Sequence, residues 1–176
     1  MIEVEVKVSA DHSKIRPLLE KIGAGKIGVE EQADTYFAAP YRDFAKTDEA
    51  LRIRSLGGQA VLTYKGPKLD KVSKTREELE TPVDEATAVK IFRALGFSEA
   101  GAVRKKREIF RAGEIIVCLD AVEGLGEFLE VELDVEDEKD LGSSRDQLFK
   151  LLSQLGVDEK DSIRTSYLEM VLGNKN

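Results

Sequence analysis

The sequence of 176 residues predicts an α+β fold, and three observations support this prediction. Most of the chain alternates apolar and polar residues in short runs, as half-buried β-strands do. Three other segments carry apolar residues three and four positions apart, which is the spacing of amphipathic helices. A pair of glycines, Gly57 and Gly58, separates two alternating runs and predicts a β-hairpin.

The first predicted strand lies at the N-terminus, where Glu3, Glu5 and Lys7 alternate with apolar residues. The hairpin strands cover residues 51–56 and 60–65. Alternation predicts further strands at residues 34–37, 75–81, 103–111, 114–121 and 127–135, and a last strand at 164–171.

The three predicted helices are marked at their ends by residues that favour helix termini. The first runs from about Asp11 to Ile22, the second starts near Asp84, and the third starts near Ser143 or Ser144. Polar cap residues precede the helices, and glycines at positions 96 and 156 follow the second and third. Since no linker-like stretch divides the chain, we expect one domain over residues 1–172 and a short tail over 173–176.

Composition excludes several classes of function. No apolar run approaches the ~18 residues of a membrane span, so we expect no membrane partner. Cys118 is the only cysteine and His12 the only histidine, which disfavours disulfides, zinc sites and Ser-His-Asp catalysis. A single cysteine also suits a cytoplasmic location. The net charge of −7 disfavours nucleic acid as a partner, because such binding depends on a basic surface.

Most predicted strands have one charged face, because alternate residues of a strand point to the same side. The charged faces carry the following residues: Arg52 and Arg54, Lys65, Arg76 with Glu78 and Glu80, Lys105 with Arg107, and Glu130 with Glu132. Alternation alone favours a sheet with this face in water and helices on the other.

A second interpretation is that the sheet closes into a barrel with the charged faces inside. Enclosed charges of both signs are costly unless they pair or bind a ligand. Basic side chains suit phosphate oxygens, and clustered carboxylates suit Mg²⁺ or Mn²⁺. A closed barrel would therefore suit a metal-bound polyphosphate, which a local basic site could attract despite the negative net charge.

The residues in order along the chain resemble the CYTH superfamily, which joins class IV adenylyl cyclases and thiamine triphosphatases. The opening residues 3–7, EVEVK, match the ExExK signature of that family. The resemblance continues through QADTYF (32–37), LRIR (51–54), LTYKGP (62–67), REELE (76–80), KKR (105–107), LDAVEGLGEFLEVE (119–132) and SYLEM (166–170). It implies an antiparallel eight-stranded tunnel barrel flanked by helices, which binds a triphosphate and a divalent metal inside.

The resemblance also implies roles for individual residues. The carboxylates implied to bind Mg²⁺ or Mn²⁺ are Glu3, Glu5, Asp120, Glu130 and Glu132. The cations implied to bind the triphosphate are Lys7, Arg52, Arg54, Lys65, Arg76, Lys105 and Arg107, of which Lys65, Arg54 and Arg107 are the implied catalytic residues. A homodimer is compatible with the resemblance.

The motifs in residues 119–132 and 166–170 are most similar to the class IV adenylyl cyclase branch, which converts ATP to cyclic AMP and pyrophosphate. The same lining could serve a triphosphatase that acts on tripolyphosphate, thiamine triphosphate or a nucleotide. A third interpretation is a non-catalytic protein that binds nucleotides or polyphosphate. The motifs that hold a triphosphate do not separate these functions, and the sequence identifies no general base.

Overall fold

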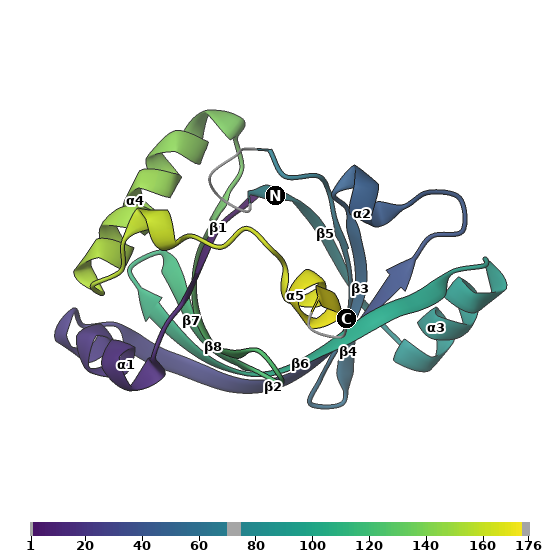
Figure 1. Cartoon of the computed structure of the whole chain (residues 1–176), viewed down its shortest axis with the longest axis horizontal. Helices are drawn as coiled ribbons and strands as arrows, with labels where there is room; N and C mark the ends of the chain where they lie inside the picture. Colours follow the sequence, from purple (N-terminus) through teal and green to yellow (C-terminus); the bar gives the residue numbers. More distant parts are fainter. Residues whose placement is uncertain (1, 70–74, 174–176) are drawn as a thin grey trace.

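The computed structural model describes residues 2–69 and 75–173. The strands in this part of the chain are β1 (Ile2–Ser9), β2 (Gly25–Ala38), β3 (Ala50–Leu56), β4 (Gln59–Lys65), β5 (Arg76–Val83), β6 (Ser98–Ala112), β7 (Ile115–Val122) and β8 (Gly126–Val135). They form one closed barrel in the order β1-β5-β4-β3-β2-β6-β7-β8. Figure 1 looks into this ring of strands. The predicted α+β fold with an eight-stranded antiparallel barrel is therefore confirmed.

Strand β1 closes the barrel by pairing with β8 on one side and with β5 on the other, and the two pairings differ in length. The pairing of β1 with β8 extends over the whole of β1, from Ile2 opposite Val135 to Ser9 opposite Phe128. The pairing of β1 with β5 involves only Ile2 and Glu3, opposite Glu77 and Arg76. Because antiparallel partners lie on both sides of β1, one face of this strand points into the ring.

The helices of the described residues are α1 (His12–Lys21), α2 (Phe44–Thr47), α3 (Glu85–Ala94), α4 (Leu141–Gln154) and α5 (Tyr167–Gly173), with short 3-10 turns at Glu138–Asp140 and Glu159–Asp161. The three predicted helices are confirmed as α1, α3 and α4. Asp11 and Asp84 cap α1 and α3, since their carboxylates accept hydrogen bonds from the backbone N–H groups of Ser13 and Thr87. In residues 2–69 and 75–173, no helix has the length and apolar character needed to cross a bilayer.

Strands β2 and β6 are much longer than the alternation at 34–37 and 103–111 predicts. They pair with each other from Gly25 opposite Arg111 to Ala38 opposite Ser98, and they form the long curved lower edge of the ring in Figure 1. The start of β2 is largely exposed, so its sequence lacks the apolar alternation of a half-buried strand. Backbone pairing with β6, which the sequence pattern does not show, extends the strand.

The predicted strand at 164–171 is wrong, because this segment contains α5. Ser166 and Glu169 form a reciprocal cap: the Ser166 N–H donates to Glu169 Oε2 (2.6 Å), and the Glu169 N–H donates to Ser166 Oγ (3.2 Å). This pattern, a serine followed three residues later by glutamate, starts helices. The cap was the sequence signal for α5, and the apolar residues around it concealed the signal. The predicted tail lies outside the described residues except for Gly173.

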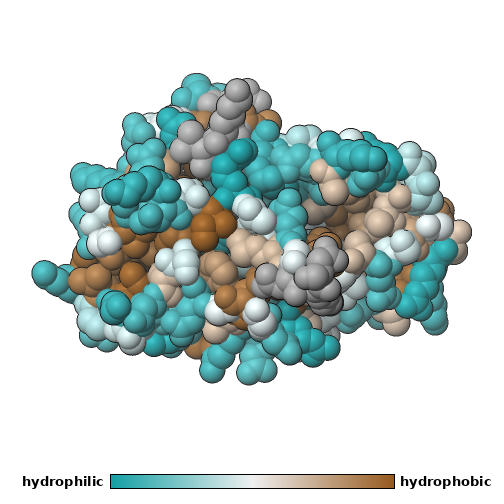
Figure 2. All heavy atoms as spheres, in the orientation of Figure 1, coloured by the Kyte–Doolittle hydropathy of each residue, from teal (hydrophilic) through white to brown (hydrophobic). Residues whose placement is uncertain are grey.

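The largest apolar cluster lies outside the ring and determines which strand faces point inward. Val4, Val6 and Val8 of β1 pack against residues of α4 that include Leu148 and Leu152, and all five side chains are at most 1% exposed. Figure 2 shows hydrophobic side chains gathered over α1 and α4, at the left of the molecule. Since the valines face the helices, the intervening Glu3, Glu5 and Lys7 face the interior.

A second apolar cluster fills one end of the barrel interior beneath α5. It consists of Tyr36, Val103, Val122, Phe128 and Tyr167, with partly buried side chains of α5 packed against it. The rings of Phe128 and Tyr167 lie edge to face, with centroids 5.1 Å apart. In Figure 1, α5 lies in the opening of the ring. The interior is therefore apolar at this end and ionic over the rest.

Candidate active site

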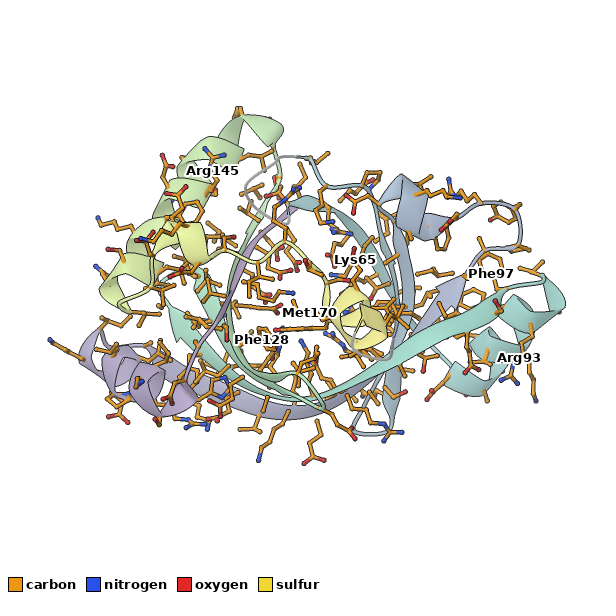
Figure 3. All side chains as sticks on the ribbon, in the orientation of Figure 1. Lys65, Arg93, Phe97, Phe128, Arg145 and Met170 are labelled. Carbon is orange, nitrogen blue, oxygen red and sulfur yellow. The ribbon has the colours of Figure 1, made fainter. Side chains whose placement is uncertain are left out.

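The barrel contains a cavity of about 620 Å³ that is lined mainly by charged side chains. Every predicted site residue lines this cavity except Lys7 and Asp120. The predicted residues that line it are Glu3, Glu5, Arg52, Arg54, Lys65, Arg76, Lys105, Arg107, Glu130 and Glu132. In Figure 3, Lys65 points into the space inside the ring, whereas Arg93 of α3 points away from it. The inward orientation of the charged strand faces thus brings residues from six strands together.

Asp120 lies behind the cavity wall, where it holds two of the lining cations. Arg107 donates two hydrogen bonds to it, at 2.7 Å from Nε and 2.6 Å from Nη2, and Lys105 Nζ donates a third at 2.7 Å. The Tyr167 hydroxyl donates to the same carboxylate (3.0 Å). The Asp120 side chain is 0% exposed. With this many donors, Asp120 positions Lys105 and Arg107 in the structure and does not face the cavity as a metal ligand would.

Burial and the neighbouring carboxylates act in opposite directions on the pKa values of the cations that Asp120 holds. Arg107 also pairs with Glu130, so its guanidinium bridges two carboxylates. Burial alone would lower the pKa of Arg107, but Asp120 and Glu130 raise it well above its ordinary value. Burial and the charge of Arg107 lower the pKa of Lys105, against the opposing effect of Glu130 and Asp120. Arg107 is therefore a permanent positive charge in the cavity wall.

Asp34 of β2, the strand that pairs with β6, has the same positioning function for the arginines of β3, and the sequence analysis missed it. Its carboxylate accepts hydrogen bonds from Arg54 Nε (2.7 Å) and Nη2 (2.8 Å), and Arg52 Nη1 lies 3.6 Å away. Burial would raise the pKa of Asp34, but Arg54 and Arg52 hold it below its ordinary value. The predicted strand at 34–37 contained Asp34 on the same face as Tyr36, but this face carried a single charge, and no site role was assigned to it.

Lys65 forms the third cationic position, on β4. Its ammonium pairs with Glu78 of the neighbouring strand and lies 3.9 Å from Glu3 Oε1. The Lys65 side chain is 18% exposed, so it remains reachable from the cavity. Lys65, Arg54 and Arg107, the three predicted catalytic residues, therefore come from three different strands and line one cavity.

Lys7 is the predicted triphosphate ligand that the structure places farthest from that role. Its side chain is fully buried, and Nζ donates to the carbonyl oxygen of Thr165 and lies 4.2 Å from the centre of the Tyr167 ring. The backbone N–H of Ile163 also donates to the Lys7 carbonyl (2.7 Å). In this structure Lys7 therefore points into the barrel but contacts the segment that leads into α5, and it does not line the cavity.

The carboxylates of Glu3, Glu5, Glu130 and Glu132 line the same cavity, and their repulsion raises the pKa of Glu132. Burial, together with the charges of Glu3, Glu130 and Glu5, raises the pKa of Glu132 to about 8, although Arg107 acts in the opposite direction. A carboxyl group in this environment stays protonated at neutral pH unless a cation compensates its charge. This acidic cluster is defined here as Glu3, Glu5, Glu130 and Glu132.

The acidic cluster suits a divalent metal in its chemistry but is not arranged as a ready site. Carboxylate oxygens are the ligands that Mg²⁺ and Mn²⁺ prefer. Within the described part of the chain, no group of three or more His, Cys, Asp or Glu side chains is placed to hold a metal ion. The pairing of Glu130 with Arg107 shows one reason, since this carboxylate is engaged by a guanidinium.

Asp120→Asn tests whether Asp120 compensates the buried cations. We expect the free energy of unfolding to fall by about 3–5 kcal/mol, because removal of one partner leaves the other charges buried without compensation. The exposed Asp146 of α4 provides the matched control, and Asp146→Asn should leave stability nearly unchanged. Denaturant titration of both variants measures the difference. Equal losses in the two variants would contradict the role given to Asp120.

Glu132→Gln tests the raised pKa of Glu132. Between its unfolded pKa of about 4.3 and its raised folded value, the carboxyl binds more protons when folded, so stability falls as pH rises through this range. The loss starts above the unfolded pKa and is complete once the pH exceeds about 8, the folded value. We expect Glu132→Gln to show a shallower fall in unfolding free energy than the wild type in metal-free buffer. Parallel pH profiles would show that Glu132 is ionised in the folded protein.

Comparison with known proteins identifies the family of this chain. The CYTH domain matches residues 1–167. A proposed adenylate cyclase of Methanocaldococcus jannaschii is 44% identical over 172 residues, which cover 97% of this chain and 98% of that protein. The adenylate cyclase CyaB of Aeromonas hydrophila is 31% identical over 139 residues, which cover 78% of this chain and 70% of that protein.

A solved structure has the same fold. A protein of Pyrococcus horikoshii OT3 is 38% identical and superposes with a TM-score of 0.90, over 98% of this chain and 99% of the other. The family match therefore rests on sequence over nearly the whole chain and on the closed barrel itself. The chain belongs to the CYTH family.

Proposed function

We propose that the protein is a divalent-metal-dependent enzyme that acts on a triphosphate inside the barrel, and that it converts ATP to cyclic AMP and pyrophosphate. The observation that carries this proposal is the lining of one cavity by fixed cations and by an acidic cluster. The relatives in M. jannaschii and A. hydrophila, one a proposed and one a named adenylate cyclase, support the choice of reaction.

The cations provide the triphosphate-binding part of the proposal. Asp34 and Asp120 hold Arg54 and Arg107 in place, and both arginines line the cavity, so ligand binding there would cost little additional side-chain freedom. Among the described residues, Arg52 Nε is a buried donor that has no hydrogen-bond partner. An unpaired buried donor is unfavourable, and a phosphate oxygen would satisfy it.

The acidic cluster provides the metal-binding part. The residues that would hold Mg²⁺ or Mn²⁺ are Glu3, Glu5, Glu130 and Glu132. To bind the ion, Glu130 would release the guanidinium of Arg107, and Glu132 would release its proton. The bound ion would supply charge neutralisation at the phosphate oxygens. The acidic cluster suits a divalent ion in the chemistry of its ligand atoms, since a cation stabilises carboxylates whose charges repel one another.

The chemical step requires mainly positioning and charge stabilisation from this chain. In the cyclase reaction the 3′-hydroxyl of ATP attacks the α-phosphorus, its bond to phosphorus forms, and the bond to pyrophosphate breaks. Arg54, Lys65 and Arg107 would hold the triphosphate so that pyrophosphate leaves in line with the attacking oxygen, and their charges would stabilise the negative charge on the leaving group. The hydroxyl proton must leave through a base that neither the sequence nor the cavity lining identifies.

A triphosphatase is the second candidate, because the same lining could hold a triphosphate while water attacks the terminal phosphorus. The lining contacts phosphate oxygens, and these are common to ATP, tripolyphosphate and thiamine triphosphate. A non-catalytic binder of nucleotides or polyphosphate is the third. The three candidates share the fold, and they differ in which phosphorus is attacked or in whether any is attacked.

A product assay decides among these candidates. The purified protein is incubated with Mg²⁺ or Mn²⁺ and, separately, with ATP, tripolyphosphate and thiamine triphosphate, and the products are separated by chromatography. We expect cyclic AMP and pyrophosphate in equal amounts from ATP, with loss of product in Glu132→Gln and not in the exposed control Glu123→Gln. Release of orthophosphate without cyclic AMP would show that the protein is a triphosphatase and not a cyclase. Metal-dependent ATP binding without turnover would indicate a non-catalytic binder.

Arg54→Ala tests the cationic lining independently of turnover. We expect the dissociation constants of ATP and tripolyphosphate to rise about tenfold or more, the size expected for hydrogen bonds between charged groups. Arg104 of β6 is exposed and does not line the cavity, so Arg104→Ala is the matched control. Calorimetric titration measures both variants. A similar loss of affinity in the two would mean that binding depends on overall charge and not on the barrel interior.

A further inference from the structure

Tyr167, the first residue of α5, has its ring against two buried ammonium groups inside the barrel. Lys7 Nζ lies 4.2 Å from the ring centre, and Lys105 Nζ lies 5.0 Å from it. A cation within about 6 Å of the centre of an aromatic ring is attracted to the ring face, and the attraction is strongest where water is excluded. The Lys7 and Lys105 side chains are both buried. Tyr167 therefore contacts cations from two strands, β1 and β6.

The Tyr167 ring is fixed by packing and by the segment that precedes it. The residue is buried, and its ring lies edge to face with Phe128, with centroids 5.1 Å apart. In Figure 3, Phe128 lies inside the ring of strands, beside α5. Lys7 Nζ donates to the Thr165 carbonyl oxygen, and the Ile163 N–H donates to the Lys7 carbonyl oxygen (2.7 Å). These contacts tie the segment to β1, so the ring is already in place beside Lys7.

The start of α5 is also held against β6. A Cβ atom at Gly101 would lie 2.8 Å from Leu168 Cδ1, so a larger residue there would displace the leucine from the strand. The reciprocal cap between Ser166 and Glu169 fixes the first turn of the helix. Since Tyr167 lies between Ser166 and Leu168 in the chain, the cap and this packing determine the position of its backbone.

The Tyr167 hydroxyl group is less important to the cations than the ring. It donates to Asp120 Oδ2 (3.0 Å), but the same carboxylate accepts two hydrogen bonds from Arg107 and one from Lys105. Hydrogen bonds from charged donors are stronger than those from a neutral hydroxyl. Without the hydroxyl, Asp120 would therefore keep its three stronger partners, whereas without the ring Lys7 and Lys105 would both lose a contact.

An aromatic ring suits this position because it stabilises a cation without a charge of its own. Lys105 lines the cavity, and it shares Asp120 with Arg107. A further carboxylate beside Lys105 would stabilise the ammonium but would also repel a phosphate. The ring adds stabilisation and leaves the positive charge of the cavity wall unchanged.

We propose that Tyr167 is a positioning residue whose ring keeps the ammonium groups of Lys7 and Lys105 in place, so that Lys105 is presented to a polyphosphate in the cavity. The inference rests on the proposed function for the identity of this anion. A cyclase, a triphosphatase and a non-catalytic binder would all need Lys105 at the same place. Tyr167 acts through the lysines and has no part in the chemical step.

Two substitutions separate the effect of the ring from that of the hydroxyl group. Tyr167→Phe keeps the ring, and Tyr167→Leu removes it. Dissociation constants for tripolyphosphate are measured by calorimetry on the full chain, with Ca²⁺ in place of Mg²⁺ to slow turnover. We expect about tenfold weaker binding in Tyr167→Leu, since a buried cation–π contact is lost. Tyr167→Phe should bind nearly as tightly as the wild type, because the ring remains.

The reactivity of the lysines provides a second measurement, which needs no ligand. The protein is treated with an amine-acetylating reagent, and mass spectrometry measures acetylation at Lys7, Lys105 and Lys65. Lys65 of β4 pairs with Glu78 and serves as the internal reference. In Tyr167→Leu we expect acetylation of Lys7 and Lys105 to rise about fivefold relative to Lys65, because the lost ring contact releases both ammonium groups. In Tyr167→Phe the ratio should stay at the wild-type value.

Tyr41 provides the matched control. It is 73% exposed and does not line the cavity, so Tyr41→Leu should change neither the tripolyphosphate affinity nor the acetylation ratio. A general loosening of the fold in Tyr167→Leu would raise acetylation at Lys65 as well, so the ratio distinguishes a local effect from loss of structure.

The outcomes separate this inference from the proposed function. If Tyr167→Phe loses as much affinity as Tyr167→Leu, the hydroxyl group and not the ring positions the site, and the inference is wrong. It is also wrong if Tyr167→Leu keeps the wild-type affinity and acetylation ratio, or if acetylation rises equally at all three lysines. Absence of tripolyphosphate binding by the wild type would overturn the proposed function, while the acetylation ratio would still show whether the ring holds the lysines.

Discussion

The structure depends on the compensation of buried charges of both signs inside a closed barrel. Asp120 is its centre, because it accepts hydrogen bonds from Lys105, Arg107 and Tyr167 and is fully buried. Closure removes the water that would otherwise solvate the charged strand faces, so each cation needs a fixed carboxylate or a ligand. The same pairing that makes the barrel stable also holds the cations in place.

This arrangement explains how a protein with a net charge of −7 can provide a site for an anion. The cations of the barrel strands that line the cavity lie on β3, β4, β5 and β6, and carboxylates hold several of them at fixed positions in the wall. Asp34 and Asp120 each hold an arginine through two hydrogen bonds, which fixes the guanidinium groups in the cavity wall. Fixed charges of this kind are the main source of electrostatic stabilisation in enzymes.

Much of this could be predicted from the sequence, because alternation in a strand determines which residues share a face. Closure could not, since the same alternation fits an open sheet in water, and only the resemblance to the CYTH superfamily indicated a barrel. Asp34 lay in the predicted strand at 34–37 but was its single charge, so it received no site role, and α5 was missed because apolar residues around a capping pair resemble a strand. The burial of Lys7 could not be predicted from local sequence, because it depends on contacts with Thr165 and Tyr167, which lie 158 and 160 positions away in the chain.

The central claim is that the barrel interior binds a triphosphate through its fixed cations. A crystal structure determined with Mg²⁺ and tripolyphosphate tests it most directly. The account predicts phosphate oxygens within hydrogen-bond distance of Arg54 and Lys65, with Asp34 still paired to Arg54. Phosphate bound only outside the barrel, with Lys65 still paired to Glu78 and Arg107 still paired to Glu130, would contradict it.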